Sequence, residues 1–150
     1  VEVDAKLKQM EALLNKIIAS TRDYYGHAEK KLVKFALMIA GKIVGDAANE
    51  HKSVATRLAK EALKQATERT TVTILCHPDD EAELQGAESE LKTVSEGIRE
   101  VEVRPSPRVS LGGIIMETQG GSVDATIETI LEELHIALLE DEPPTSEDSE

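Results

Sequence analysis

Apolar and small residues recur at alternating steps of three and four along the first part of the chain, which contains no proline up to residue 48. Lys31 interrupts this stripe once. The repeat of about 3.5 residues predicts one long helix with an apolar seam that favours left-handed pairing with another helix. Two interpretations are open: a helix lying on its own domain, and a coiled coil with a second chain, which we favour because no other segment is comparably long. The seam residues expected in a dimer interface are Leu7, Met10, Leu14, Ile17, Thr21, Tyr24, Ala28 and Phe35.

Beyond residue 48 the spacing of apolar residues changes between the period of a helix and that of a strand. The predicted helices cover 53–66, 79–94 and 124–138, and the predicted strands cover 71–76, 101–104 and 114–118. The first two strands can lie parallel through a right-handed helical crossover, and the second and third can form an antiparallel pair. The sequence therefore predicts an α+β fold class, in which a long N-terminal helix precedes a small domain with a three-stranded mixed sheet packed by helices.

The same pattern predicts three parts along the chain. Residues 1–48 form the N-terminal helix and coiled-coil dimerisation stalk, and residues 49–139 form the α/β domain. Residues 140–150 are rich in Glu, Asp, Pro, Ser and Thr. A segment with so few apolar residues cannot bury enough surface to fold, so we expect a disordered acidic tail.

Two glycine pairs frame the third predicted strand. Gly112 and Gly113 precede it, and Gly120 and Gly121 follow it. Neither pair has the GxGxxG or GxxxxGK[ST] spacing that cradles phosphate, so we interpret both as turns. Asp124 stands where the last helix should begin, and its carboxylate can accept hydrogen bonds from the free amides of the first turn.

The net charge of the chain narrows the class of binding partner. The formal net charge is −12, which repels phosphate backbones and anionic membrane surfaces and favours basic partner segments. The longest apolar run, 35–41, is far shorter than the roughly 20 residues of a membrane span, and no signal-peptide pattern opens the chain.

The single cysteine, Cys76, excludes an intramolecular disulfide and suits a reducing compartment. It falls on a predicted strand without a neighbouring base, so we interpret it as buried packing. Because the chain starts at Val1, we expect a fragment of a longer protein.

The string His77-Pro78-Asp79-Asp80 resembles the zinc-binding motif of sugar-linked de-N-acetylases, in which His and Asp bind zinc and a neighbouring Asp acts as base. That family needs a further metal-binding histidine and a larger sheet, and only His135 follows on a predicted helix. We therefore favour a structural interpretation, in which Pro78 ends a strand and Asp79 or Asp80 caps a helix. A small zinc hydrolase using His77, Asp79 and Asp80 is the alternative, and otherwise no catalytic residue, metal ligand or cofactor is expected.

The run 112–126 carries the most specific resemblance to a known family. It reads Gly-Gly-Ile-Ile-Met-Glu-Thr and then Gly-Ser-Val-Asp-Ala-Thr, against a family pattern of GG-x-x-x-E-(S/T) and G-x-(I/V)-D-A-(S/T). With the turn at 77–80, where that family has (N/H)-P-x-D, the whole chain resembles the C-terminal two-thirds of the FliH family of flagellar export stator proteins and their relatives in type III secretion injectisomes. The residues that carry the motif are Pro78, Asp80, Gly112, Gly113, Glu117, Gly121, Asp124 and Ala125.

The resemblance implies a non-enzymatic, cytoplasmic homodimer that is peripherally associated with the export apparatus and needs no cofactor. Its domain would bind the amino-terminal segment of the export ATPase, restrain that ATPase and deliver it to the export gate. The family also docks on the rotor switch complex through an amino-terminal region with tryptophans; this chain has none, so we expect that contact only through a region outside this sequence. The domain plan also resembles the E subunit of rotary-ATPase peripheral stalks, a second interpretation, but that family reads Asn-(S/T) near position 124. Of the two export systems, we favour the flagellar one.

Overall fold

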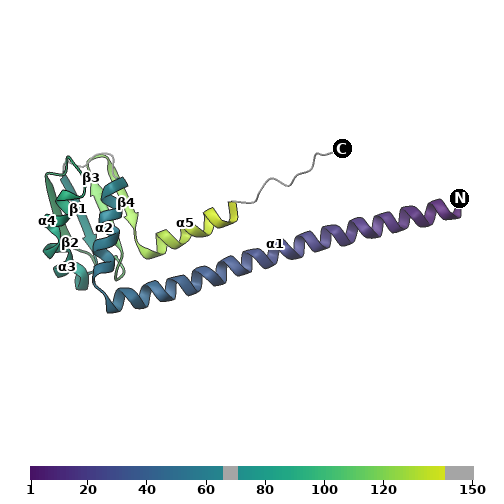
Figure 1. Cartoon of the computed structure of the whole chain (residues 1–150), viewed down its shortest axis with the longest axis horizontal. Coiled ribbons are helices and arrows are strands. Elements are labelled where there is room, and N and C mark those ends of the chain that lie inside the picture. Colours follow the sequence, from purple (N-terminus) through teal and green to yellow (C-terminus); the bar gives the residue numbers. More distant parts are fainter. Residues whose placement is uncertain (66–70, 141–150) are drawn as a thin grey trace.

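The computed structural model of the chain describes residues 1–65 and 71–140, and it shows one long helix projecting from a small α/β domain (Figure 1). The long helix, α1 (Glu2–Glu50), is called the rod below, and residues 51–140 are called the domain. The domain contains α2 (Ser53–Gln65), β1 (Thr71–Cys76), the 3-10 turn η1 (Pro78–Asp80), α3 (Glu81–Gly86), α4 (Glu88–Thr93), β2 (Glu100–Pro105), β3 (Ile114–Thr118), β4 (Gly121–Ala125) and α5 (Ile127–Glu140). This arrangement confirms the α+β fold class. Ala66, the predicted end of the second helix, and residues 141–150 of the predicted tail lie outside the described ranges.

The four strands form one mixed sheet in the order β2-β1-β3-β4. β1 runs parallel to β2, with Ile74 opposite Val103, and antiparallel to β3, with Ile74 opposite Met116. The predicted parallel pair is therefore confirmed, whereas the predicted pairing of the second strand with the third is wrong. The connection after β2 is longer than a tight hairpin loop. It turns at the end of β1, where the N–H of Ser106 donates to the carbonyl of Cys76 at 2.7 Å, so that β3 is placed on the far side of β1.

The sheet has a fourth strand, where the sequence predicted three. β4 forms a hairpin with β3 in which Thr118 pairs with Gly121, so Gly120 lies in a hairpin turn. The only large apolar residue of β4, Val123, is 38% exposed. Because β4 shows no alternation of apolar and polar residues, it carries no strand signal that a pattern could detect.

The last helix starts later than the predicted cap. Asp124 lies in β4, and its Oδ1 accepts a hydrogen bond from the N–H of Thr126 at 2.9 Å, which lowers the pKa of Asp124. Thr126 instead caps α5, because its Oγ1 accepts from the N–H of Thr129 at 3.4 Å. The prediction that Asp124 caps the helix is therefore wrong, and its carboxylate stabilises the turn between β4 and α5.

The predicted helix over 79–94 consists of three short pieces, η1, α3 and α4. The helix is interrupted at Ala87, whose φ of −93° and ψ of −1° depart from the values of about −63° and −42° of a regular α-helix. Gly86, a weak helix former, immediately precedes the break. On either side of it, Leu84 and Leu91 are both fully buried, so the break lets two short helices each place one leucine in the core.

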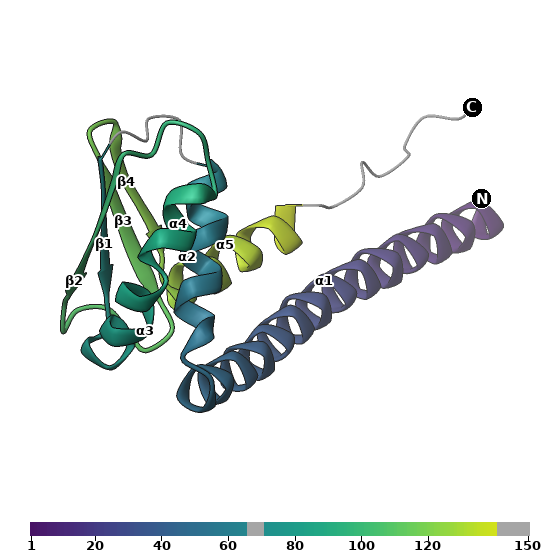
Figure 2. The ribbon, with the colours of Figure 1, turned by 60° about the vertical axis from the view of Figure 1, so that its left-hand side comes forward.

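The core lies between the sheet and three helices, α2, α3 and α4, which all cover the same face (Figure 2). It is built from aliphatic residues, methionine and cysteine: Ala55, Ala59, Ala62, Leu63, Val72, Ile74, Cys76, Leu84, Leu91, Val101, Val103, Ile114 and Met116. Every second residue of β1 belongs to it, which explains the alternation seen in that strand.

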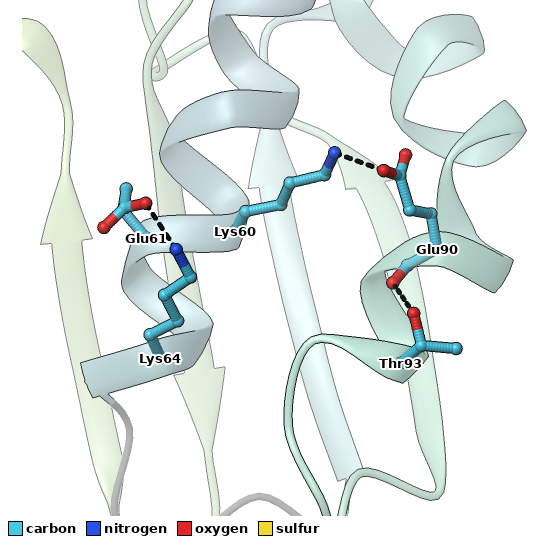
Figure 3. Close-up of polar contacts among 5 residues, drawn as sticks. All are labelled: Lys60, Glu61, Lys64, Glu90 and Thr93. Atoms are coloured by element: carbon cyan, nitrogen blue, oxygen red, sulfur yellow. Dashed lines mark hydrogen bonds and ion pairs between the residues drawn. The ribbon is translucent and has the colours of Figure 1, made fainter.

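Polar contacts join two of the covering helices (Figure 3). Lys60 of α2 donates to Glu90 of α4 at 2.6 Å, and within α2 Lys64 donates to Glu61 at 2.9 Å. The hydroxyl of Thr93 donates to the carbonyl of Glu90 at 2.7 Å and so ties the last turn of α4. These contacts are exposed, and such ion pairs typically contribute less than about 1 kcal/mol each.

The helix α5 lies beside the domain-proximal part of the rod (Figures 1 and 2). A Cβ added to Gly41 of the rod would lie 3.0 Å from Cδ1 of Leu131 of α5, so glycine permits the close approach. Val33, Leu37 and Val44 of the rod are half-buried. Within the described ranges, no helix combines the length and apolar character that crossing a membrane requires.

Candidate functional site

The predicted seam lies exposed along the rod. Its large apolar side chains are between 52% and 71% exposed: Leu7, Met10, Leu14, Ile17, Tyr24 and Phe35. Thr21 is exposed and Ala28 is half-exposed. A single long helix gains most of its stability in proteins from packing of its apolar face, and an exposed apolar stripe of this extent marks an interaction surface. That a second chain covers it remains a prediction.

Three more exposed apolar residues belong to the stripe, one within the predicted range and two beyond Phe35. Leu32, Ile39 and Ile43 are 69%, 59% and 62% exposed. At about 100° per residue they fall on the same face of the helix as Phe35. The stripe therefore passes through Leu32 and is not interrupted at Lys31, and a step of four residues after Ala28 was the signal that could have shown this.

The rod presents this stripe on the side opposite to α5. Leu37 and Gly41, which face α5, lie about half a turn around the helix from Ile39. The last helix therefore leaves the stripe uncovered down to Ile43, close to the domain.

Two motif residues meet where the rod joins the domain. The side chain of Asp80 is fully buried, and its Oδ2 accepts a hydrogen bond from the N–H of Gly112 at 2.7 Å. Its Oδ1 lies 3.9 Å from Nζ of Lys52 and has no hydrogen bond within the described residues. The prediction that Asp80 caps a helix is wrong, because its side chain makes no cap hydrogen bond and instead holds the loop before β3.

The end of the rod packs closely against Gly112. Its φ of +81° is in the left-handed region that favours glycine. A Cβ there would lie 2.6 Å from Cβ of Ala48, the one buried residue of the rod, and 3.3 Å from Cγ1 of Val54 at the start of α2. Backbone conformation and close packing therefore both require glycine at position 112. We call the region formed by Gly112, Asp80, Ala48 and Lys52 the junction.

The other motif residues shape turns and strands. Pro78 begins η1, and Gly113 is packed so closely that a Cβ would lie 3.1 Å from Cα of Thr126. Gly121, with a φ of +143°, forms the hairpin, Glu117 is exposed on β3, and Ala125 packs against the core. The motif residues therefore mainly determine the backbone geometry of turns and strands.

The His-Pro-Asp-Asp string also has a structural role. Nδ1 of His77 accepts a hydrogen bond from the N–H of Asp79 at 3.1 Å, so His77, and not Asp79, caps the 3-10 turn. Asp80 is held by the loop before β3, and His135 lies on α5 beside the rod. Among the residues that the structure describes, no group of three or more His, Cys, Asp or Glu side chains is placed to hold a metal ion. This geometry gives the zinc-hydrolase alternative no support.

Cys76 is a core residue, as the sequence predicted. Its side chain is 0% exposed and its Sγ donates to the carbonyl of Arg104 at 3.8 Å. Burial, together with the nearby carboxylates of Asp80 and Glu81, raises the pKa of the thiol to about 11. Since the unfolded thiol has a pKa of about 8.5, the stability gained by keeping it protonated is fully present below pH 8.5 and is lost as the pH rises toward 11.

We therefore expect Cys76 to react with a thiol reagent at pH 8 at least about a hundredfold more slowly in the native protein than in the urea-unfolded chain, because both burial and thiol protonation suppress the reaction. The measurement is the rate of labelling by dithionitrobenzoate. Equal rates in the two states would show that the core around β1 is open. Cys76 is the only cysteine of the chain, so labelling reports on the domain alone.

Comparison with known proteins places these features in one family. A family model described as flagellar assembly protein FliH matches residues 4–134, which include the rod, the junction and the sheet. The chain is 23% identical over 133 residues to a flagellar assembly protein FliH of Borreliella burgdorferi, covering 89% of this chain and 44% of that protein. It is 24% identical over 126 residues to a type 3 secretion system stator protein of Yersinia pestis, covering 84% of this chain and 56% of that protein. The chain thus spans about half the length of the curated relatives that it matches.

Proposed function

Because the chain belongs to the FliH family of flagellar assembly proteins, we propose that it is a stator and regulator of the ATPase that drives flagellar or type III protein export. Two copies pair through their rods, and each domain is available to bind the amino-terminal segment of the ATPase. The dimer restrains the ATPase or delivers it to the export gate, at the cytoplasmic side of the export apparatus. The protein itself catalyses no reaction and uses no cofactor.

The observation that carries this proposal is the uncovered stripe on the rod. From Leu7 to Ile43 it is about 54 Å long at 1.5 Å per residue. A second identical helix would bury it on both chains at once, as in two-stranded coiled coils. A dimer of this form is extended and rigid, which suits a stator better than a single exposed helix would.

The distribution of charge supports a basic partner at the domain. The rod has seven Asp and Glu residues and eight Lys and Arg residues, so it is nearly neutral. Residues 51–140 have seventeen Asp and Glu residues and nine Lys and Arg residues. Because opposite charge speeds and orients association, a basic segment is attracted to the domain and not to the rod.

Charge introduced into the stripe is expected to dissociate the dimer. In a dimer, Leu14→Glu or Ile17→Glu would bury like charges against each other, and we expect the dissociation constant to rise at least about a hundredfold. Light scattering at tens of micromolar measures the mass. Asn15→Glu, an exposed position outside the stripe, is the matched control and is expected to stay dimeric. A monomeric wild-type protein at that concentration would contradict the homodimer.

Binding of the ATPase is tested directly by capture of the cognate export ATPase on the immobilised 150-residue chain. We expect capture of the full ATPase and loss of capture when its amino-terminal segment is deleted. Capture that does not depend on that segment would show that another part of the ATPase is bound, and no capture would contradict the proposed partner.

A further inference from the structure

Four large apolar residues recur at steps of seven along the middle of the rod, and we call them the second row: Ile18, Tyr25, Leu32 and Ile39. Each is between 57% and 69% exposed. A step of seven is nearly two full turns, so the four side chains follow one line along the helix. The rod therefore carries a continuous apolar line in addition to the residues predicted for the dimer interface.

The second row makes the apolar face of the rod wider than pairing with one helix requires. Tyr25 lies about 100° around the helix from Tyr24, and the row of small residues that includes Ala28 lies between them. Apolar residues at two of seven positions form the narrow seam of a two-stranded coiled coil, whereas three of seven are typical of a helix that contacts several neighbours in a bundle. The rod has the wider pattern from residue 14 to residue 39, with Lys31 the one charged residue at those positions.

Pairing of two rods leaves the second row at the edge of the pair. Under the proposed function, on which this inference rests, the rods pair through the predicted seam. The row is about 32 Å long from Ile18 to Ile39 at 1.5 Å per residue. The helix α5 does not cover it, because α5 packs at Leu37 and Gly41, on the opposite side of the rod. An uncovered apolar row of this length beside a helix pair is suited to docking of a third helix.

The charge of the rod indicates which kind of helix fits. Residues 16–34 contain five Lys and Arg and two Asp and Glu, a net charge of +3, whereas residues 1–15 and 35–50 each have a net charge of −1. The positive segment coincides with the second row, and its charged side chains are exposed: Lys16, Arg22, Asp23, Glu29, Lys30, Lys31 and Lys34. Two rods paired in register bring three positive charges each to this segment. An acidic helix offsets that repulsion, whereas a further pair of rods would add to it.

We propose that the paired rods bind a third helix of another protein along the second row. This helix is amphipathic, its apolar stripe covers Tyr25 and Leu32, and its flanks carry Asp and Glu. Three heptads of partner helix match the length of the row. The partner proposed for the domain is basic, so the two surfaces of this protein select segments of opposite charge.

The test uses a designed fluorescent peptide of three heptads, with Ile and Leu along its seam and Glu on its flanks. Repulsion between its glutamates opposes pairing of the peptide with itself. Anisotropy measures its binding to the full 150-residue chain at a concentration at which light scattering finds two chains. The matched probe has Lys in place of every Glu, and we expect it to bind at least about tenfold more weakly at low salt, with a difference that shrinks as salt is added.

Substitutions in the second row test the apolar contact. Tyr25→Gln combined with Leu32→Gln removes two of the large side chains and introduces good helix formers. We expect the dissociation constant of the Glu peptide to rise at least about tenfold. Light scattering of this variant is expected to show the mass of two chains, and circular dichroism the helix content of wild type.

Charge reversal tests the second part of the proposal. Lys16→Glu combined with Lys30→Glu is expected to weaken binding of the Glu peptide at least about tenfold at low salt. Lys6→Glu combined with Lys8→Glu is the matched control, because it makes the same change of charge at exposed positions of the rod before the positive segment. We expect this control to bind within about twofold of wild type.

The possible results separate this proposal from the proposed function. A monomeric wild-type chain would overturn both. If the chain is dimeric but binds the Glu peptide no more tightly than the Lys peptide, the second row is not such a site and the proposed function stands. A complex with the mass of one chain and one peptide would also overturn the site, because the peptide would then have replaced the second rod.

Two further results would assign the second row to copies of this chain instead of a partner. The first is dissociation of the dimer by Tyr25→Gln combined with Leu32→Gln, which would place the row inside the dimer interface. The second is a wild-type mass of four chains, which would mean that another pair of rods covers the row. An equal loss of binding in the control with Lys6 and Lys8 reversed would show a general effect of charge and would overturn the choice of an acidic partner.

Discussion

Asp80→Ala is expected to lower the free energy of unfolding of the domain by about 3 kcal/mol. The buried carboxylate accepts a charge-assisted hydrogen bond from the N–H of Gly112 at 2.7 Å. Alanine would leave that buried N–H without an acceptor and would remove the negative charge that faces Lys52. Native-state labelling of Cys76 measures the effect, and a loss of this size should speed labelling on the order of a hundredfold.

Two controls separate the hydrogen bond of Asp80 from its charge. Asp80→Asn keeps an oxygen that can accept from Gly112 and removes only the charge, so we expect a smaller loss than with alanine. Asp79→Ala changes the neighbouring carboxylate, which is 69% exposed, and should stay within about 0.5 kcal/mol of wild type. If Asp80→Ala were as mild as Asp79→Ala, Asp80 would not stabilise the junction.

The junction determines how the rod is attached to the domain. Ala48 is the only buried residue of the described rod, and it packs against Gly112. Asp80 holds the same glycine from the side of the sheet. The proposed stator role requires force to pass between rod and domain. Besides the contact of α5 with the rod at Gly41, the end of the rod packs on one glycine that a buried carboxylate holds. Loosening either should therefore change the direction of the rod before it unfolds the rod itself.

Local pattern was sufficient to predict the elements with strong periodicity. The long helix, β1 with its buried Val72 and Ile74, and β3 were all predicted at nearly their observed bounds. Each has either a helical or an alternating arrangement of apolar residues that is independent of the rest of the fold. β4 was missed because Val123 alone cannot establish a period, and the pairing of β3 with β1 was missed because strand order depends on the path of the loop after Ser106.

The candidate sites divide in the same way, into features that local sequence pattern predicts and features that depend on the whole fold. Asp80 and Gly112 were both named from the motif, but their contact joins residues 32 positions apart in sequence and could not be predicted from either segment alone. The apolar seam of the rod was predicted from the spacing of its apolar residues alone. The exposed apolar surface of α5 was not predicted, because residues such as Leu134 and Leu138 are normally expected in a core, and only the fold shows that they remain half exposed.

Gly112→Ala is expected to destabilise the domain by about 3–4 kcal/mol. Alanine at a φ of +81° costs about 1–2 kcal/mol in backbone strain. Its Cβ would also lie 2.6 Å from Cβ of Ala48, so the end of the rod must move, which adds about 1–3 kcal/mol. Faster labelling of Cys76 measures the total, and a change below about 1 kcal/mol would mean that the rod is not seated on this glycine.

A matched control and a double-mutant cycle separate the two causes. Gly97 has a φ of +99° and no atom within 4 Å of an added Cβ, so Gly97→Ala carries the strain alone and should cost about 1–2 kcal/mol. Ala48→Gly by itself costs about 1 kcal/mol as a glycine in a helix. Combined with Gly112→Ala it removes the clash, so the double variant should be at least about 1 kcal/mol more stable than the sum of the single effects predicts. If the effects are additive, the cost of Gly112→Ala comes from backbone strain at residue 112. The contact of Ala48 with Gly112 would then contribute little to the attachment of the rod.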